Sequence, residues 1–419
     1  MRPTAVVMNM FYTGLGIARS LGENGVPVIG LSSRRRVYGN LTRYAKTLLC
    51  PDSRDEPEAL LRFLLGLSGR IGHRAVIFPT RDHDLVFLDH FREQLSPHFQ
   101  LVLPERGALE ACLNKWETYQ WTCRSGLFAP KCWLIETGDA LHEVLPEITY
   151  PCVLKPVAAH HWRQGGKWAL VGARKAIQVL SREELIAAYD TISRADQRVL
   201  VQEMVSGGDD SLMVAACYLD RQSNWVAGFS AQKLVQCPEG FGSGCIMQNT
   251  NRQDLFERTA RLLKAMRFSG IAEVEYKWDT VAQDYALIEI NPRPWDQHRL
   301  GKASGVDLIY TAYCDLAHLP VHATVGPAST HKWVADDLFL MTALELLWKR
   351  SPRIRELFRH ARGKRMYAIW SAKDPLPFLV YIITRFLPDV ITAGLRALSA
   401  KLRHATAVPA TPEKGGFGI

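Results

Sequence analysis

The stretch "GIAEVEYKWDTVAQDYALIEINPRP" at residues 270–294 constrains the fold more than any other part of the sequence. Apolar and polar residues alternate on both sides of a short polar segment, which predicts two antiparallel strands joined by a turn. Successive side chains of a strand point to opposite faces, so the first strand has its charged residues on one face: Glu273, Glu275 and Lys277. By the same alternation, one face of the second strand carries Leu287, Glu289 and Asn291.

The expected turn over "DTVAQD" brings Glu275 next to Glu289 on the partner strand. Like charges directly opposite each other are destabilising, and burial makes this worse unless a cation lies between them. Two carboxylates and the Asn291 amide are hard oxygen ligands, which suit Mg²⁺ or Mn²⁺. Arg293 directly follows the strand, where its planar guanidinium would meet a phosphate or a carboxylate. The alternative is an exposed polar face on which Lys277 offsets the acids.

The first part of the chain predicts a parallel α/β layer. Residues 4–31 read as strand, glycine turn, helix and strand, and Gly25 is expected to end the helix. Short apolar strands at 75–80 and 101–104 continue this alternation. We therefore expect a domain of Rossmann type over residues 1–105.

Gly14 and Gly16 precede the expected helix and are similar to the opening of a dinucleotide-binding motif. Arg19 takes the place of the third glycine, and the second strand runs into "LSSRRR" without an acidic residue at its end. The sequence therefore favours a tight turn into a helix over a nicotinamide site.

The middle of the chain also alternates strands and helices. A single helix is expected over 105–126 and ends at Gly126. The edge strand "RVLVQEMV" and the strand "SLMVAACYL" are expected to be joined by the turn "SGGDD". Asp209 and Asp210 of this turn are placed where a carboxylate could hold ribose hydroxyls; the alternative is an ordinary hairpin with an acidic turn.

Three lysines in this part of the chain each have two interpretations. Lys155 lies in the apolar strand "CVLKP", where it must reach solvent or neutralise an anion, and Lys233 in "SAQKLVQ" is similar. Lys115, taken alone, is expected to face solvent. The "QGGK" loop at 164–167 either approaches phosphates through its backbone N–H groups or is a plain hairpin turn.

Residues 311–419 form a third region, which is more helical. It contains a basic segment over 349–365 and an apolar run over 375–402 that Arg385, Pro388 and Asp389 interrupt. A membrane span needs about 20 mostly apolar residues, so a core or interfacial helix is the expectation here. The tail from residue 405 onward has a composition typical of disorder.

The formal charge of +9 and the pI of about 9.1 favour anionic partners without choosing among nucleotides, lipid headgroups and nucleic acid. The basic segment lacks an interleaved aromatic pattern, so we expect no nucleic-acid partner. Nine cysteines without paired or metal-ligand spacing indicate reduced thiols, and the first residues show no export signal. These features predict a cytoplasmic protein, with peripheral membrane contact through the C-terminal region as an alternative.

Taken in order, Lys115, "VLKP", "VQEMVSGGDD", Lys233, "GIAEVEYK" and "LIEINPRP" resemble the ATP-grasp superfamily. Within that superfamily the chain is most similar to the D-aspartate-ligase-like predicted carboligases, over about residues 1–310. The resemblance implies a multidomain fold of α/β and α+β type. Its implied parts are a Rossmann-like preATP-grasp domain (1–105), an ATP-grasp domain (106–310, with a lid at about 125–200) and a helical C-terminal region with a disordered tail (311–419).

The resemblance also implies an ATP-dependent ligase that joins a small carboxylate to a small amine through an acyl-phosphate and releases ADP and phosphate. ATP and Mg²⁺ (or Mn²⁺) are the implied cofactors. The residues implied to contact ATP are Lys115, Lys155, Gln202, Glu203, Val205 and one of Asp209 and Asp210. The implied metal ligands are Glu275, Glu289 and Asn291. Lys233 and Arg293 would stabilise the transferring phosphoryl group and the acyl-phosphate.

The chain departs from the family pattern at two places. Gln202 stands where family hinges often begin with glutamate. The loop that begins with "HHW" at 160–162 is plainer and richer in glycine in many members. Because of these departures, the resemblance does not define the substrate or the behaviour of the lid. Two other functions therefore stay as alternatives: an ATP-grasp-like binding protein without catalysis, and a membrane-surface protein.

The pocket for the acceptor is expected near Arg293, Trp295 and His298, and near "GFGSG" at 240–244. Trp295 is as compatible with packing as with a substrate wall. For His298, a structural role is favoured over that of a general base.

Overall fold

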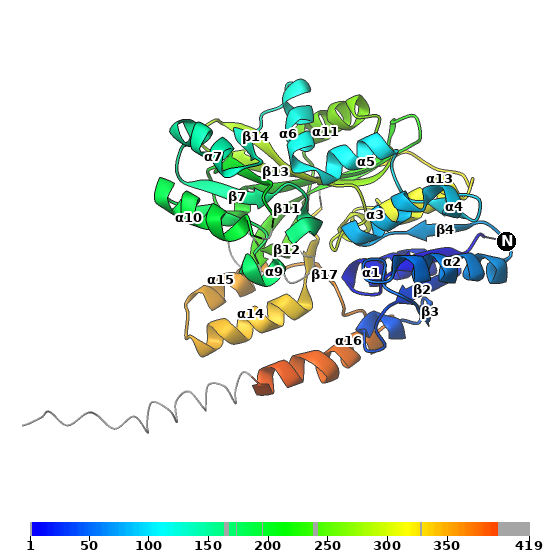
Figure 1. The fold of residues 1–419 in the computed structure, drawn as a ribbon. Helices are drawn as coiled ribbons and strands as arrows, with labels where there is room; N and C mark the ends of the chain where they lie inside the picture. Colours follow the sequence, from blue (N-terminus) through cyan, green and yellow to red (C-terminus); the bar gives the residue numbers. More distant parts are fainter. Residues whose placement is uncertain are drawn as a thin grey trace, which may run out of the picture.

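The computed structural model describes residues 2–162, 167–172, 174–194, 196–237, 242–326 and 329–392. Within these residues the strands form a five-stranded sheet, a four-stranded sheet and a large sheet of eight strands. Figure 1 shows the five-stranded sheet with its helices on one side of the molecule and the other two sheets beside it.

The five-stranded sheet is parallel throughout, in the order β3-β2-β1-β4-β5. Its strands are β1 (Ala5–Met8), β2 (Val28–Ser32), β3 (Lys46–Leu49), β4 (Ala75–Phe78) and β5 (Phe99–Leu101). The helices of this part are α1 (Tyr12–Glu23), η1 (Tyr38–Leu41), α2 (Pro57–Ile71), α3 (Asp82–His90) and α4 (Arg92–Leu95). All residues of β1 and β4 are buried, as expected of parallel strands with helices on both faces. The predicted α/β layer is confirmed, although β3 was not predicted.

The predicted glycine turn is wrong, because α1 begins at Tyr12 and includes both glycines. A Cβ atom at Gly14 would lie 1.7 Å from the carbonyl oxygen of Asn9, and one at Gly16 would lie 2.6 Å from Nε2 of His298. The two glycines therefore allow other parts of the chain to approach the first turns of the helix closely.

The four-stranded sheet is antiparallel, in the order β6-β9-β7-β8. Its strands are β6 (Cys132–Ile135), β7 (Cys152–Pro156), β8 (Ile177–Val179) and β9 (Val199–Glu203). The helices before and around it are α5 (Arg106–Leu113), α6 (Lys115–Arg124), α7 (Gly138–Val144), η2 (Leu145–Glu147), α8 (Ala159–Trp162), α9 (Lys167–Leu170) and α10 (Arg182–Ile192). The single helix expected over 105–126 is thus two helices. The Asn114 side chain accepts hydrogen bonds from the backbone N–H groups of Trp116 and Glu117 and so starts a new helix at Lys115.

The large sheet has the order β14-β13-β10-β11-β12-β16-β17, and β15 pairs with β11. Its strands are β10 (Leu212–Leu219), β11 (Trp225–Cys237), β12 (Ser243–Thr250), β13 (Gly270–Asp279), β14 (Asp284–Asn291), β15 (Thr324–Val325), β16 (Lys332–Val334) and β17 (Arg365–Tyr367). The associated helices are η3 (Asp209–Ser211), α11 (Gln253–Ala265), α12 (Leu300–Ala303), α13 (Leu308–Leu316), α14 (Asp336–Trp348), α15 (Arg353–His360), α16 (Leu376–Tyr381) and the π-helical η4 (Ile382–Phe386).

The hairpin predicted through "SGGDD" is wrong. β9 belongs to the four-stranded sheet and β10 to the large sheet, so this segment crosses between two sheets. β9 is also not an edge strand, because it pairs with β6 on one side and with β7 on the other. Local turn residues indicate where the chain changes direction, but they do not say which strands pair.

The region after residue 311 is helical as expected, but it also contributes strands that were not predicted. β16 pairs with β12 and β17 pairs with β16, which extends the large sheet at one edge. No helix in the described part of the chain is long and apolar enough to cross a membrane. The expected disordered tail lies outside the described residues.

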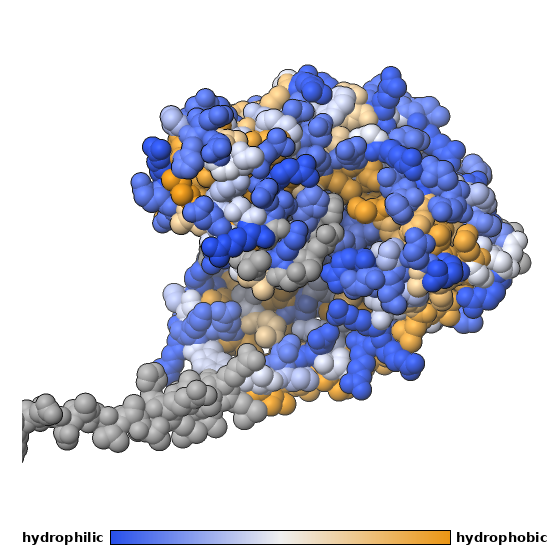
Figure 2. Space-filling view, in the orientation of Figure 1, coloured by the Kyte–Doolittle hydropathy of each residue, from blue (hydrophilic) through white to orange (hydrophobic). Residues whose placement is uncertain are grey.

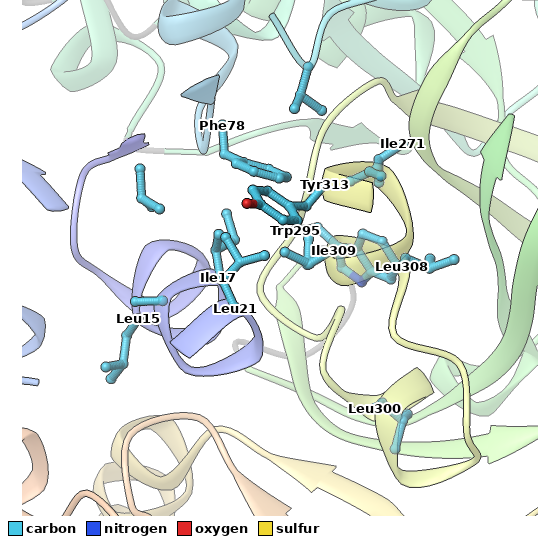
Figure 3. Packing of buried hydrophobic residues seen from close by; sticks show 14 of the residues in the cluster. Leu15, Ile17, Leu21, Phe78, Ile271, Trp295, Leu300, Leu308, Ile309 and Tyr313 are labelled. Carbon is cyan, nitrogen blue, oxygen red and sulfur yellow. The ribbon is translucent and has the colours of Figure 1, made fainter. Parts of the chain in front are cut away.

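One apolar core joins the five-stranded sheet to the large sheet. It contains Leu15, Ile17 and Leu21 of α1, together with Trp295 and Tyr313 from the later part of the chain. Figure 3 shows Ile17 and Leu21 facing Tyr313 and Trp295, between α1 and the segment that ends in α13, with Leu15 farther away on the other side of the helix in this view. The start of the chain and the segment after β14 are therefore held together by burial of apolar surface.

Candidate active site

A cavity of about 620 Å³ opens where the three sheets approach one another. Its wall comes from the loop after β4, from β7 to β9 of the four-stranded sheet, and from β11, β13 and β14 of the large sheet. The loop after β14 closes one side of the cavity. Figure 2 shows this face hollowed between the part that carries α10 and the part that carries α14.

The face of β13 and β14 that lines the cavity carries the predicted acids. Glu275 lies opposite Glu289, and Glu273 lies opposite Asn291. The predicted pairing of Glu275 with Glu289 is therefore confirmed. An acidic pair in this register needs a compensating positive charge.

A β-bulge at Ile288 corrects one detail of the predicted hairpin. The register shifts between Glu275 and Tyr276, so that Tyr276 pairs with Leu287 and Ile288 is the extra residue. Ile288 lines the cavity, whereas Leu287 is buried in the apolar core on the other side of the sheet. The prediction that Leu287 shares a face with Glu289 is wrong, because a bulge interrupts the alternation of a strand.

Two lysines neutralise the paired glutamates. Nζ of Lys233 lies 2.5 Å from a carboxylate oxygen of Glu275, and Nζ of Lys115 lies 2.8 Å from one of Glu289. Burial acts to lower the pKa of Lys115, but the charge and hydrogen bond of Glu289 raise it above the ordinary lysine value. The pKa of Lys233 is raised in the same way by Glu275. Lys115 in turn holds the pKa of Glu289 well below its usual range, so this pair is charged at neutral pH.

Glu273 is a third carboxylate on this face, and it is absent from the ligands assigned on the sequence. It is only 3% exposed, and it accepts a hydrogen bond from Nδ2 of Asn291 at 3.0 Å. Burial, and then the nearby charge of Glu275, raise the pKa of the Glu273 carboxyl well above its usual value. The alternation that identified Glu275 already placed Glu273 beside it, so the signal was present in the sequence.

The donors on this face fit a divalent cation. Three carboxylates and one side-chain amide supply the oxygen ligands that Mg²⁺ prefers, and a cation would relieve the crowding that raises the pKa of Glu273. In this structure the carboxylates of Glu275 and Glu289 form ion pairs with Lys233 and Lys115. Among the described residues, no group of three or more His, Cys, Asp or Glu side chains is arranged as a metal site.

Lys155 faces the cavity from β7. Its Nζ donates to Oε1 of Gln202 on the neighbouring strand β9, at 2.7 Å. Burial, and then the nearby charge of Lys115, lower the pKa of Lys155 to about 8. A phosphate group is the type of partner that would restore the ammonium form of such a lysine.

The segment from Glu203 to Val205 also lines the cavity, but it makes contacts of its own. The Glu203 carboxylate accepts hydrogen bonds from the backbone N–H of Lys131 at 3.1 Å and from the Thr149 hydroxyl at 3.3 Å. The carbonyl of Val205 accepts one from Nζ of Lys277 at 2.9 Å. Lys277 thus joins the lysines at this side of the cavity; the sequence interpretation treated it only as a charge that offsets the acids.

The two neighbouring aspartates differ in position. Asp209 lines the cavity, whereas Asp210 does not. The backbone carbonyl of Asp210 accepts a hydrogen bond from Nε2 of Gln232 at 2.7 Å. Of the two, Asp209 is therefore the better placed to meet a ligand.

Arg293 is held by the five-stranded part of the molecule. Its Nε lies 2.7 Å from Oδ1 of Asp82, and both side chains are mostly buried. Burial acts to lower the pKa of Arg293, but Asp82 raises it above the ordinary value. Asp82 was not predicted as a site residue. It is the first residue of α3, shortly after the apolar strand β4, and ligands often bind at this carboxyl edge of a parallel sheet.

Trp295 and His298 have different surroundings. Trp295 is 3% exposed, stacks on Phe229 with ring centres 6.0 Å apart, and lines the cavity with its remaining surface. His298 is buried outside the cavity wall, with Nε2 at 3.3 Å from the carbonyl oxygen of Thr13. Burial lowers the pKa of His298 to about 4, which agrees with a neutral, structural histidine.

Two predicted loops are only partly described. Residues 164–166 of the "QGGK" loop and 240–241 of "GFGSG" lie outside the described residues. The rest of the second loop, Gly242 to Gly244, lines the cavity, as does Lys175 just before β8.

Comparison with known proteins agrees with this geometry. Residues 129–317 match the family model described as "Carbamoyl-phosphate synthase L chain, ATP binding domain". The chain is 21% identical over 266 residues to a D-aspartate ligase of Enterococcus faecium (strain Aus0004), which covers 60% of this chain and 62% of that protein. It is 23% identical over 172 residues to a D-alanine–D-alanine ligase of Ruminiclostridium cellulolyticum, covering 37% and 41% of the two chains. The chain thus spans less than two thirds of the length of either relative.

A solved structure extends the comparison to the whole fold. The biotin carboxylase domain of the Hydrogenobacter thermophilus 2-oxoglutarate carboxylase, in complex with MgADP, ADP and bicarbonate, superimposes with a TM-score of 0.61. The two are 14% identical, and the match covers 78% of this chain and 72% of the other. This chain is an ATP-grasp fold protein. The predicted resemblance is confirmed, and D-aspartate ligase is a distant relative.

In this ATP-grasp protein the cavity brings together nearly all the residues assigned on the sequence. Those that line it are Lys115, Lys155, Gln202, Glu203, Val205, Asp209, Lys233, Glu275, Glu289, Asn291 and Arg293. Asp210 is outside the lining. The ATP-grasp cavity also has polar residues that were not assigned, chiefly Asp82, Lys175, Glu273, Lys277 and Asp296.

Proposed function

We propose that this chain is an ATP-dependent carboxylate–amine ligase, which forms an amide or peptide-like bond through an acyl-phosphate and releases ADP and phosphate. The observation that carries the proposal is one cavity in which a cluster of carboxylates faces a cluster of lysines. The acids are Glu273, Glu275 and Glu289. The lysines are Lys115, Lys155, Lys175, Lys233 and Lys277.

The lysine side of the cavity suits the phosphates of ATP. The Nζ atoms of Lys155 and Lys115 each donate a hydrogen bond to one oxygen atom of the protein, at 2.7 Å and 2.8 Å. A polyphosphate would give each of them further acceptors. Asp209 lies near the β9 end of the cavity, where we assign it to the ribose hydroxyls, and the backbone of 203–205 is assigned to the adenine.

The acid side suits divalent cations. Glu275, Glu289 and Asn291 would hold Mg²⁺ or Mn²⁺, and Glu273 adds a fourth ligand to the set that the sequence predicted. Bound Mg²⁺ would neutralise the charge that develops on the phosphate oxygens during transfer. Lys115 and Lys233 hold the acids apart and oriented in the structure described here.

A carboxylate is a poor electrophile until it gains a leaving group. One of its oxygens takes the γ-phosphoryl group of ATP; the bond from that phosphorus to the bridging oxygen breaks, and ADP leaves. The amine nitrogen then attacks the acyl carbon, the bond from this carbon to the phosphate oxygen breaks, and the nitrogen loses a proton. We assign Lys233 and Arg293 to stabilise the charge on the transferring group and on the acyl-phosphate, because both are buried beside the acids.

A screen for ADP release tests the proposal. The purified protein, ATP and MgCl₂ are incubated with a panel of amino acids and other small carboxylates, each with and without a second amine. We expect ADP to be formed with at least one carboxylate, and the rate to rise when the correct amine is added. If nucleotide binds but no combination yields ADP, the catalytically silent binding protein is the better description.

A second property stays as a proposal for the C-terminal region. The chain from α16 to residue 391 exposes a row of apolar side chains at helical spacing: Leu376, Leu379, Ile383, Leu387 and Ile391. Figure 2 shows apolar surface along this lower edge of the molecule. Such a row, in a chain that also carries the basic helix α15, suits peripheral contact with an anionic lipid surface. Co-sedimentation with anionic liposomes should weaken in the double variant Ile383→Glu, Leu387→Glu; equal sedimentation would refute the contact.

A further inference from the structure

Asp296 is a carboxylate on the cavity wall that forms no ion pair with any described residue. It is half-buried in the loop after β14, and the cavity borders it. Its one hydrogen bond comes from the Thr13 hydroxyl, which donates to Oδ1 at 2.7 Å. The second carboxylate oxygen has no protein donor among the described residues. Asp296 therefore brings to the cavity wall a carboxylate with one oxygen open to a ligand donor, and the charge of Arg293 offsets its own without forming an ion pair.

Three other acids of the cavity wall differ from Asp296 in this respect. Glu275 and Glu289 bind lysines, and Asp82 binds Arg293. Arg293 itself makes its remaining bonds to the carbonyl of Pro294 at 3.2 Å and to Oδ1 of Asn291 at 3.5 Å. It makes no hydrogen bond to Asp296, although the charge of Asp296 contributes to its raised pKa.

The position of Asp296 is fixed by the first turn of α1. Thr13 is 6% exposed and is the second residue of this helix. The Thr13 carbonyl lies 3.3 Å from Nε2 of His298, so the two segments are joined at two points. Gly16 leaves the space for the His298 ring, because a Cβ atom there would lie 2.6 Å from Nε2. Gly16 thereby allows the loop after β14 to pack closely against α1.

We propose that Asp296 binds the ammonium group of the amine substrate. The inference rests on the proposed ligase function and names the residue that selects the second substrate: a cationic primary amine, such as that of an amino acid. The free carboxylate oxygen offers a charge-assisted hydrogen bond to an N–H donor. The amine is thereby directed to the part of the cavity wall that Trp295 and Asp296 form.

This arrangement gives the two substrates separate places. Phosphates and the carboxylate to be activated are attracted to the lysines and to Arg293. The ammonium group is held at Asp296, and it must release a proton to solvent before its nitrogen can attack the acyl carbon. A neutral alcohol of the same shape lacks the positive charge and the additional N–H donors that the carboxylate recognises.

The direct test is ligand binding with Asp296→Asn. This variant keeps an oxygen that accepts from Thr13 but removes the negative charge. The probes are the L- and D-amino acids, each paired with its α-hydroxy acid, which has a hydroxyl group in place of the ammonium group. Stabilisation against thermal unfolding is measured in the presence of ADP and MgCl₂. Asp55→Asn is the matched control, because Asp55 forms an exposed surface pair with Arg54 outside the cavity.

We expect at least one amino acid, and not its hydroxy acid, to stabilise the wild-type protein and the Asp55→Asn control. Its apparent affinity should fall by about 10- to 100-fold in Asp296→Asn. Equal binding of an amino acid and its hydroxy acid would overturn the proposal. So would unchanged affinity in Asp296→Asn, or the absence of any stabilising amino acid.

Turnover separates this inference from the proposed function. Hydroxylamine is a small amine that is mainly neutral at pH 7.5, and it traps an acyl-phosphate as a hydroxamate with release of phosphate. If the ligase proposal holds, Asp296→Asn should lose more of its turnover with the amino acid than of its hydroxamate formation, and the Michaelis constant for the amino acid should rise. Absence of hydroxamate with every carboxylate, in wild type and variant alike, would refute the ligase. Selective amino-acid binding that Asp296→Asn abolishes would then still support the ammonium site.

Discussion

Two clusters of buried charge in this protein both pair a basic with an acidic side chain, and they serve different purposes. The cavity cluster joins Lys115 to Glu289 and Lys233 to Glu275. The second cluster joins Arg19 of α1 to Asp374, a residue after β17, at 2.9 Å and with both side chains almost fully buried. Both connect segments far apart in the chain, so distance and sequence separation alone do not distinguish a site from a structural contact.

The difference lies in how completely each carboxylate is satisfied. Asp374 accepts hydrogen bonds from Arg19, from the Thr42 hydroxyl at 2.6 Å and from the backbone N–H of Arg43 at 3.0 Å. It does not border the cavity. The acids of the cavity instead crowd one another, and the pKa of Glu273 is raised by burial and by that crowding. A fully satisfied buried charge indicates structure, whereas an under-compensated one beside a cavity indicates a ligand.

The largest effect is expected from Glu289→Ala. Turnover, measured as ADP release, should fall by about 1000-fold, because the variant removes a metal ligand and the partner of Lys115. The unfolding midpoint should stay close to that of wild type, since the cavity cluster is built for ligands. The surface variant Glu257→Ala is the control. If turnover survives in Glu289→Ala, the assignment of the metal site is wrong.

The opposite result is expected for Asp374→Ala. Removal of this partner leaves Arg19 charged and buried, which should lower the free energy of unfolding by about 3–5 kcal/mol. Urea unfolding followed by circular dichroism measures the loss. At a temperature where the variant is still folded, its affinity for ADP should equal that of wild type. A large change in ADP affinity, with unfolding unaffected, would contradict the division into two clusters.

The pH dependence of nucleotide binding sharpens the comparison further. Burial and Lys115 lower the pKa of Lys155 to about 8 in the free protein, so this lysine is charged below pH 8 and neutral above it. A phosphate binds the charged form, so ADP affinity should fall as pH rises through 8, approaching about tenfold per pH unit. Calorimetric titration from pH 7 to pH 10 measures the slope.

Lys155→Arg is the matched variant for this profile, because an arginine keeps its charge over the whole range. Its ADP affinity should lack the decline that begins near pH 8. An identical decline in both proteins would show that another group causes it and that Lys155 does not contact the phosphates.

The smallest expected effects are changes in stability, and they concern the helices. Helix α1 carries Arg19 of the second cluster and Thr13, which donates a hydrogen bond to Asp296 on the cavity wall. Gly16→Ala places a methyl group 2.6 Å from Nε2 of the buried His298 and should destabilise the fold by about 1–3 kcal/mol. Gly69→Ala in α2 meets nothing within 4 Å and should stabilise by about 0.5–1 kcal/mol. Thermal unfolding of the two variants checks the signs. Destabilisation by Gly69→Ala would show that helix propensity does not explain the difference.

The residue types and the local period of apolar residues were enough to predict several elements of this fold. The alternation around Glu275 and Glu289 predicted the hairpin and the pairing of its acids, because the period of a strand is visible in the sequence. The same reasoning predicted the parallel layer at the start of the chain. It failed at Ile288, where one extra residue shifts the alternation, and at Asn114, where a side-chain cap divides one expected helix into two.

The sequence by itself determined that Glu275 and Glu289 lie opposite each other on two paired strands, because the period of a strand is a property of neighbouring residues. Only the tertiary structure decided which charges meet. Lys115 reaches Glu289 across 174 positions, Arg293 reaches Asp82 across 211, and Thr13 reaches Asp296 across 283. Such contacts depend on how three sheets pack around a shared core, and no local pattern encodes that packing. The same packing places Asp296 on the cavity wall with one carboxylate oxygen that accepts no hydrogen bond from a described residue.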